Sequence, residues 1–387
     1  MSSNTEGCRS HRFFRKQTMK LPKYAKAFAD KLKLVFHKAD VDGDIADAVV
    51  EVLNDLVASG RAKRISSQGK GYRDRFRIPL HDSQTNRYNE FDLLVALNPT
   101  RPDRTDWRMT WEYIPSRLDK EGRKRLRNLA GELLGTAAQR LLGNACIQEV
   151  HTSLDFPVHI SEVAMEVEDK QSAAAWGKTF GNQGVLETMY IASPRSDHHV
   201  CAYDKRAQFL AAFASRPDVT LKMVKDKVDQ GIKRLRIEDR QRASHNPVPL
   251  HRLGDLRQPF AGLHIYSYAE AEFELESTLH KVTLELAKDR GLQAALKLLS
   301  KTERETMRRA LARCRVDWWN SSTYAEAVTA VVKATGLFPE EAFDPLSRQT
   351  SYAEQLYLER KERNQTKSRQ AHEELRSHLD DEDDEDD

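Results

Sequence analysis

Tyr203, Asp204 and Lys205 stand side by side where an extended segment runs into a helical one, and their side chains suit phosphoryl chemistry. A phenol can attack a phosphodiester, an ammonium can stabilise the charge that develops, and a carboxylate can hold a divalent metal. The surrounding sequence predicts a strand over residues 185–191, a polar turn, and a second strand that ends in these three residues. Strand alternation then gives two faces, with His199, Cys201 and Tyr203 on one and His198, Val200 and Asp204 on the other.

Two more predicted strands carry carboxylates. In the strand predicted over residues 145–158, alternation places Asp155 and Pro157 on one face, and His159, just after the strand, continues the same face. Mg²⁺ prefers oxygen ligands, and Mn²⁺ accepts both Asp and His. The strand over residues 232–242 has one polar face, made of Arg234, Arg236, Glu238, Arg240 and Arg242. Each strand also has a plainer explanation, a capping or turn carboxylate for the first and a surface salt-bridge ladder for the second.

In chain order, the three segments resemble the signatures of the plasmid and phage rolling-circle replication initiation proteins (the replication initiation factor family, Rep_trans type). The second signature is the most specific, Thr-x-Tyr-Ile-Gly-Ser followed by Tyr-Asp-Lys-x-x-Glu. Here it stands as residues 188–193 and 203–208, with Ala192 in place of the glycine and Gln208 in place of the glutamate. Gln208 is therefore not counted as a metal ligand.

The other two signatures match in part. For Thr-Arg-x-Asp-x-x-x-Asp, Thr152 and Asp155 match, Ser153 replaces the arginine, and His159 stands at the second aspartate. The third signature, Thr-Arg-x-Glu-x-Arg, is matched by Arg236, Glu238 and Arg240.

The resemblance implies a rolling-circle replication initiator, an enzyme that nicks one DNA strand at an origin and later rejoins it. The expected chemistry is a metal-dependent tyrosine transesterification, with a 5′-phosphotyrosine intermediate and a free 3′-OH that primes synthesis. On this interpretation Tyr203 is the nucleophile, Lys205 assists it, and Tyr190 is the competing nucleophile. The ligands of Mg²⁺ or Mn²⁺ would be Asp155, His159, Glu238 and Asp204. The DNA-binding residues would be Arg234, Arg236, Arg240 and Arg195.

The family also implies partners: origin DNA, a host helicase and DNA polymerase, and a second copy of the chain in a homodimer, with no membrane. Two alternatives remain open from the sequence, a non-catalytic sequence-specific DNA-binding regulator and the nickase of an integrative element. An RNA-binding protein ranks last, because the exposed-aromatic pattern of RNA-binding sheets is missing from the predicted strands.

The order of predicted elements indicates an α+β fold, with an antiparallel-sheet nicking domain built of two ferredoxin-like halves and flanking, mainly helical segments. Residues 40–80 predict a helix and a basic hairpin, which suits either a winged helix or an ordinary element with a solvated basic face. The expected division is a basic flexible N-terminus (1–20), the helix and hairpin (21–88), the nicking domain (89–245), a helical region for DNA binding or dimerisation (246–346), and a charged disordered acidic tail (347–387).

Composition favours a partner that is a polyanion. The net charge is +3, and removing the eight acidic residues at 380–387 from it leaves +11. No apolar run approaches the roughly 20 residues of a membrane helix, and the N-terminus lacks the apolar core of a secretion signal. Four scattered cysteines without metal-site spacing suit reduced thiols in the cytoplasm.

Overall fold

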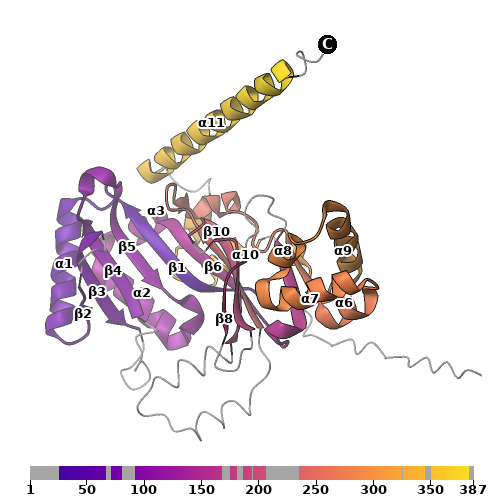
Figure 1. Cartoon of the computed structure of the whole chain (residues 1–387). Helices are drawn as coiled ribbons and strands as arrows, with labels where there is room; N and C mark the ends of the chain where they lie inside the picture. The colour runs from indigo at the N-terminus through magenta and orange to yellow at the C-terminus, as the bar shows by residue number, and fades with distance from the viewer. Residues whose placement is uncertain are drawn as a thin grey trace, which may run out of the picture.

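A large antiparallel sheet dominates the computed structural model, which describes residues 26–66, 71–80, 92–167, 175–180, 186–193, 195–205, 235–324, 326–344 and 350–382 (Figure 1). Eleven of the described strands form this sheet. In spatial order they are β2 (Lys63–Arg64), β3 (Tyr72–Pro79), β4 (Asp92–Pro99), β5 (Trp107–Tyr113), β1 (Phe28–His37), β6 (Cys146–Phe156), β11 (Leu235–Arg242), β10 (His198–Asp204), β9 (Leu186–Ile191) and β8 (Ala175–Phe180), with β12 (Val248–Pro249) beside β6.

The sheet consists of two halves that meet where β1 pairs with β6. In each half the chain starts with a central strand, β1 in the first half and β6 in the second. It then continues at the outer edge of the sheet and returns strand by strand, so that β5 lies beside β1 and β11 beside β6. Every pair in the sheet is antiparallel, which confirms the predicted α+β class. Because β1 lies between β5 and β6, the sheet crosses the boundary expected between residues 88 and 89.

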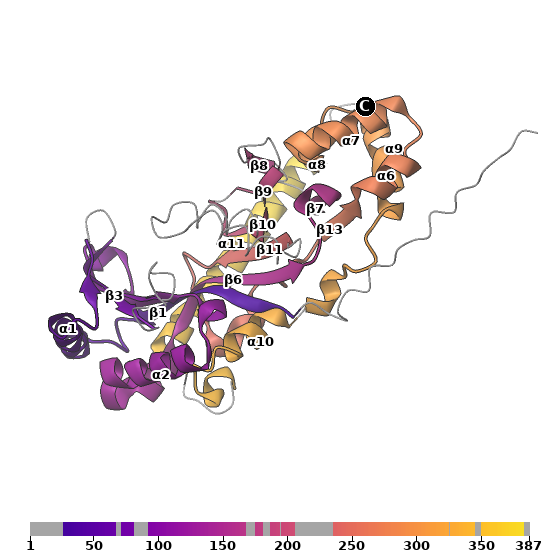
Figure 2. The same cartoon turned by 90° about the horizontal axis from the view of Figure 1, so that it is seen from below.

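One face of the first half is covered by helices α1 (Gly43–Ala58), α2 (Lys120–Leu134) and α10 (Ala327–Lys333). Figure 2 shows α2 and α10 on the same side of β1 and β6. Leu126, Leu129 and Leu133 recur at helical spacing along α2 and form the apolar stripe that is buried against this face. After α2 the chain turns at Gly135, which adopts a positive φ of 53°, and continues as α3 (Ala138–Asn144).

The same face of the second half carries a separate apolar core. Leu154, Ala202 and Ile237 point into it from three neighbouring strands. Trp318 and Trp319 pack against this core with ring centroids 4.7 and 5.8 Å from that of Phe156, so the tryptophan pair is a packing element. A two-stranded sheet, β7 (Val163–Val167) with β13 (Leu263–Ser267), completes the layer.

A helical subdomain follows β13. It contains α6 (Tyr268–Glu274), α7 (Thr278–Arg290), α8 (Leu292–Leu296) and α9 (Lys301–Arg313). Ser300 and Glu303 form a capping box that fixes the start of α9. No described helix is long and apolar enough to span a bilayer.

The expectation of a disordered C-terminal segment is wrong over most of its length, because helix α11 covers Tyr352–Glu382. Its first turns are anchored by a buried pair at helical spacing, Ala353 and Tyr357. The phenol of Tyr357 also donates a 2.9 Å hydrogen bond to Asp255. Charged composition concealed this short apolar contact. The last five acidic residues lie outside the described part of the chain.

Candidate active site

The face of the second half opposite its apolar core is polar, because alternate residues of β6, β10 and β11 turn away from that core. Register aligns these polar residues in cross-strand rows. One row is Asp155, Arg236 and Tyr203, and the next is Ser153, Glu238, Cys201 and Tyr190. The predicted grouping of Tyr203 with Cys201 and His199 on one face is confirmed by this register.

Tyr203 and Glu238 form the centre of this polar face. The phenol O–H of Tyr203 donates to Glu238 Oε1 at 2.5 Å, while Arg240 donates to Glu238 Oε2 at 2.8 and 2.6 Å. Tyr203 is 5% and Glu238 is 2% exposed, so the contact is shielded from water. Burial first, and then the Glu238 carboxylate, raise the pKa of the Tyr203 phenol far above its usual value. The phenol is therefore protonated and needs a base to become a nucleophile.

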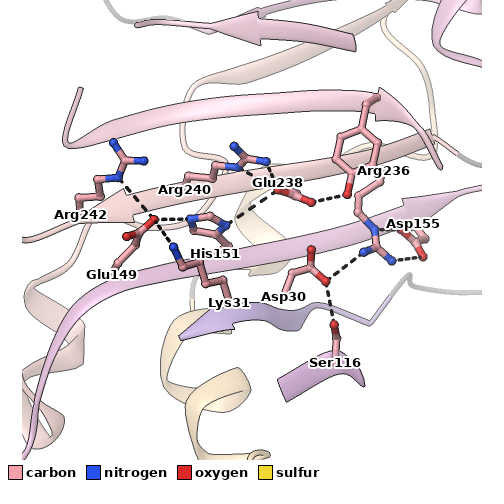
Figure 3. Close-up of polar contacts among 11 residues, drawn as sticks. Asp30, Lys31, Ser116, Glu149, His151, Asp155, Arg236, Glu238, Arg240 and Arg242 are labelled. Carbon is pink, nitrogen blue, oxygen red and sulfur yellow. Dashed lines mark hydrogen bonds and ion pairs between the residues drawn. The ribbon is translucent and has the colours of Figure 1, made fainter. Parts of the chain in front are cut away.

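Arg236 lies beside this pair and is held by two carboxylates (Figure 3). It donates to Asp155 at 2.7 and 2.9 Å in a bidentate pair, and to Asp30 of β1 at 3.0 Å. Ser116 donates to the same Asp30 oxygen at 2.7 Å. Burial would raise the pKa of Asp30, but the guanidinium of Arg236 holds it below its usual value. Arg236 thus ties the first half of the sheet to the second.

Lys205 follows β10 directly and turns back over Tyr203. Its ammonium lies 5.5 Å from the centroid of the Tyr203 ring. Burial, together with the nearby charges of Arg236 and Arg117, lowers the pKa of Lys205 to about 8. Near neutral pH this ammonium is charged, and it is a stronger acid than an exposed lysine.

A second set of polar contacts continues along β6 toward β1. His151 lies between two carboxylates, with Nε2 2.7 Å from Glu149 and Nδ1 4.0 Å from Glu238 (Figure 3). Lys31 and Arg242 reach the same Glu149 carboxylate at 3.5 and 3.4 Å. Burial opposes the ionisation of Glu149, but hydrogen bonding to His151 and these cations hold its pKa below the usual range.

The sequence prediction missed several members of this network: Asp30, Lys31, Glu149 and His151. The alternation of Glu149, His151 and Asp155 along one strand was a signal for the last two. Nothing local marks Asp30 or Lys31, because they are brought in by the pairing of β1 with β6.

The four residues expected to hold a metal do not come together. Asp204 points to the face opposite Tyr203, where its carboxylate lies 3.0 Å from Nε2 of His159. Asp155 is engaged by Arg236, and Glu238 by Tyr203 and Arg240. Within the described residues, no three His, Cys, Asp or Glu side chains are grouped so that they could bind a metal ion. Adjacent residues of a strand face opposite ways, which is why Tyr203 and Asp204 cannot serve one site.

The expected DNA-binding arginines have different surroundings. Arg236 and Arg240 are engaged in the buried ion pairs described above. Arg195 is exposed in the turn between β9 and β10, and Arg234 lies outside the described residues. Tyr190, the competing nucleophile, is half-buried directly opposite Cys201, on the same face as Tyr203. Burial, followed by the neighbouring Cys201, raises the pKa of the Tyr190 phenol as well.

No family model matches this chain, and the search of curated proteins finds no match. Among solved structures, the chain is similar to the rolling circle replication initiator protein from Geobacillus stearothermophilus. The sequence identity is 17% and the TM-score is 0.31, with 74% of this chain and 97% of the other covered. A TM-score this low carries no argument about function.

Proposed function

We propose that this chain nicks one strand of DNA by tyrosine transesterification and later rejoins it, in the manner of a rolling-circle replication initiator. The observation that supports the proposal is the hydrogen bond from the Tyr203 phenol to the Glu238 carboxylate, with Arg236 and Lys205 beside it. A nucleophile, an acceptor for its proton, and a cation, Lys205, are thereby grouped on one face of the sheet.

The proposed step transfers one phosphoryl ester. The Tyr203 oxygen attacks the scissile phosphorus while its proton passes to Oε1 of Glu238, 2.5 Å away. The new bond joins the Tyr203 oxygen to phosphorus, and the bond from phosphorus to the 3′-oxygen breaks. Lys205, with its pKa lowered to about 8, gives a proton to the leaving 3′-oxygen. Rejoining is the reverse reaction, in which the 3′-hydroxyl attacks the phosphotyrosine.

A divalent metal, Mg²⁺ or Mn²⁺, is expected from the family resemblance, but the donors of the described residues do not fit it. All four candidate carboxylate and imidazole groups are paired with other side chains: Asp155 with Arg236, Glu238 with Tyr203, and His159 with Asp204. These groups also lie on two faces of the sheet. The step above therefore uses only the chain's own residues.

As an initiator, the chain would bind origin DNA, act as a homodimer, and pass the free 3′-OH to a host helicase and DNA polymerase in the cytoplasm. The direct test uses supercoiled plasmid that carries the origin of the chain's own replicon. It compares wild type with Tyr203→Phe and with Tyr190→Phe as the matched control. Open circles with covalently attached protein should form with wild type and Tyr190→Phe but not with Tyr203→Phe. Nicking that survives in Tyr203→Phe would refute the assigned nucleophile.

The second candidate function is a DNA-binding regulator without catalysis. It is favoured by the burial and mutual pairing of Tyr203, Glu238 and Arg236, since a network of this kind also stabilises a sheet. A regulator would bind the origin tightly, leave supercoiled plasmid intact, and show the same DNA affinity in the Tyr203→Phe variant.

A further inference from the structure

The polar face of the sheet continues from the Tyr203 site across the first half. One cross-strand row reaches the outer edge of that half through paired residues, in the order Arg242, Glu149, Lys33, Glu112, Leu94, Arg77 and Lys63. The neighbours of Lys33, Glu112, Leu94 and Arg77 along their own strands belong to the apolar core beneath α1, α2 and α10. The residues of this row that belong to the first half therefore face the side of the sheet that α1, α2 and α10 do not cover. We call this side the open face.

Positive charge exceeds negative charge on this open face. We use the term basic strip for its five cationic residues, Lys31, Lys33, Lys63, Arg75 and Arg77. Three carboxylates oppose them: Asp92 lies 3.4 Å from Arg77, and Glu112 and Glu149 lie 3.1 and 3.5 Å from Lys31. Among the described residues, Lys33, Lys63 and Arg75 make no ion pair.

The uncharged positions beside the basic strip are small or aliphatic: Leu94, Ala96 and Thr110. None of these offers an aromatic surface on which a base could stack. Contacts here would go to phosphates, which carry no sequence information. The first turn of α11 packs on one end of the face, where Ala353 contacts Val35 and Cys146.

The path from Tyr203 on β10 to Arg77 on β3 crosses six strand intervals, roughly 29 Å across the sheet, and also shifts along the strands by roughly 20 Å, from the row of Asp155 to that of Glu149. Sheet twist of about 20–25° per strand turns the face by more than a right angle over this span. Duplex DNA, with a persistence length of about 150 base pairs, resists such a path, whereas a single strand follows it.

We propose that the basic strip binds the phosphate backbone of the single-stranded DNA that leaves the Tyr203 site. The inference rests on the proposed function, because it takes the DNA strand at Tyr203 as its starting point. The competing surface is the basic start of α2, with exposed Lys120 and Lys124 and half-buried Arg123, which lies on the opposite side of the sheet from Tyr203.

The test measures DNA binding by the full chain with a probe that lacks the nick site, so that binding is read without cleavage. The probe is a fluorescent single strand of mixed sequence, several times longer than the roughly 4–16 nucleotides of a single-strand binding module. Anisotropy titrations between about 50 and 200 mM salt compare wild type with two triple variants. The strip variant is Lys33→Ala, Lys63→Ala and Arg75→Ala, and the matched control is Lys120→Ala, Arg123→Ala and Lys124→Ala.

The strip variant should bind about 10- to 100-fold more weakly, and its salt slope should fall by about 2, since each lost phosphate contact removes about 0.7. The control should keep the wild-type slope. Lys63→Ala alone, at an exposed position of a two-residue strand, should give about a third of the change in slope. This single variant keeps the test valid if the triple variant fails to fold.

Three outcomes would overturn the inference: an unchanged slope in the strip variant, a greater loss in the α2 control, or a loss seen with duplex only. Nicking of the plasmid is measured separately. If the wild type nicks the plasmid and the strip variant keeps full affinity for the single strand, only this inference is overturned. A protein that never nicks but loses affinity in the strip variant overturns the catalytic proposal and leaves the basic strip as a DNA-binding surface.

Discussion

Oε1 of Glu238, on strand β11, lies 2.5 Å from the phenol oxygen of Tyr203, on the adjacent strand β10. The other oxygen of this carboxylate, Oε2, accepts hydrogen bonds from Arg240. The two side chains are nearest neighbours on adjacent strands but not register partners, since Tyr203 is paired with Arg236 and Glu238 with Cys201. The phenol thus has a single carboxylate oxygen to receive its proton. This diagonal contact makes Glu238 the group on which the proposed chemistry depends most.

Replacing Glu238 by glutamine tests that dependence. Glu238→Gln keeps the size of the side chain but removes its ability to take a proton, so single-turnover cleavage should slow by about 10²- to 10⁴-fold. Rates are measured on a single-stranded oligonucleotide that contains the nick site. The matched control is Glu149→Gln, which changes a carboxylate on the same face without contact to Tyr203. Equal losses in both variants would remove the assigned role of Glu238.

The lowered pKa of Lys205 predicts a pH dependence of cleavage. The ammonium form must be present to protonate the leaving oxygen, and it is lost as pH rises through about 8. The rate should therefore decline above pH 8 by about tenfold per pH unit. Lys205→Arg, which stays charged and does not give up a proton in this range, should be slower and insensitive to pH between about 7 and 9. A wild-type rate that is flat across the same range would contradict the assignment.

The sequence predicts features that depend on the spacing of residues within one strand or helix. The faces of β10 and β11 follow from a two-residue period within each strand, so it was predictable that Tyr203 shares a face with Cys201, and that Arg236 shares one with Glu238. The α2 stripe was predictable for the same reason, with a helical period. These patterns are local, and they survive whatever the rest of the chain does.

Pairing between distant strands was not predictable from one sequence. Asp30 reaches Arg236 from 206 positions away, and this contact exists only because β1 inserts between β5 and β6. Asp155 was expected to hold a metal from the family resemblance, but the guanidinium of Arg236 occupies both of its oxygens. A carboxylate has no mark in the sequence that separates a metal ligand from an ion-pair partner.

The buried ion pairs of Arg236 should make it a large contributor to stability. Arg236→Ala would leave Asp30 and Asp155 without their buried cation, and we expect a loss of about 3–5 kcal/mol in the free energy of unfolding. Denaturation in urea measures the loss. Arg195→Ala, at an exposed turn, is the control and should stay within about 0.5 kcal/mol of wild type. A loss below about 1 kcal/mol for Arg236→Ala would indicate that the ion pairs are solvated.

His199 should make the protein sensitive to acid. Its side chain is 1% exposed, and burial first, then Arg240 and Arg242, lower its pKa to about 4. Between about pH 6.5 and 4 the unfolded state binds a proton that the folded state does not, so stability falls as pH falls through this window. From pH 7 to 5 the loss from this group is about 2 kcal/mol. Urea unfolding at the two pH values should show a smaller pH effect in His199→Phe, and an unchanged effect would exclude His199 as the source.

The place of His159 gives the sharpest test of the metal expectation. Its imidazole is paired with Asp204 on the face opposite Tyr203, 3.0 Å from the carboxylate, and its other nitrogen lies 2.6 Å from Ser161 Oγ. His159→Ala should therefore lower stability by about 1 kcal/mol, the value of one such contact, without changing how cleavage depends on added Mg²⁺ or Mn²⁺. Cleavage rates are titrated with each metal for wild type and His159→Ala, with Ser161→Ala as the control for local packing. A ligand would behave differently, because its loss should weaken the apparent metal affinity by at least about tenfold. If His159→Ala weakened the apparent metal affinity and Ser161→Ala did not, the ion pair between His159 and Asp204 would have to open when DNA is bound, so that both side chains reach the metal.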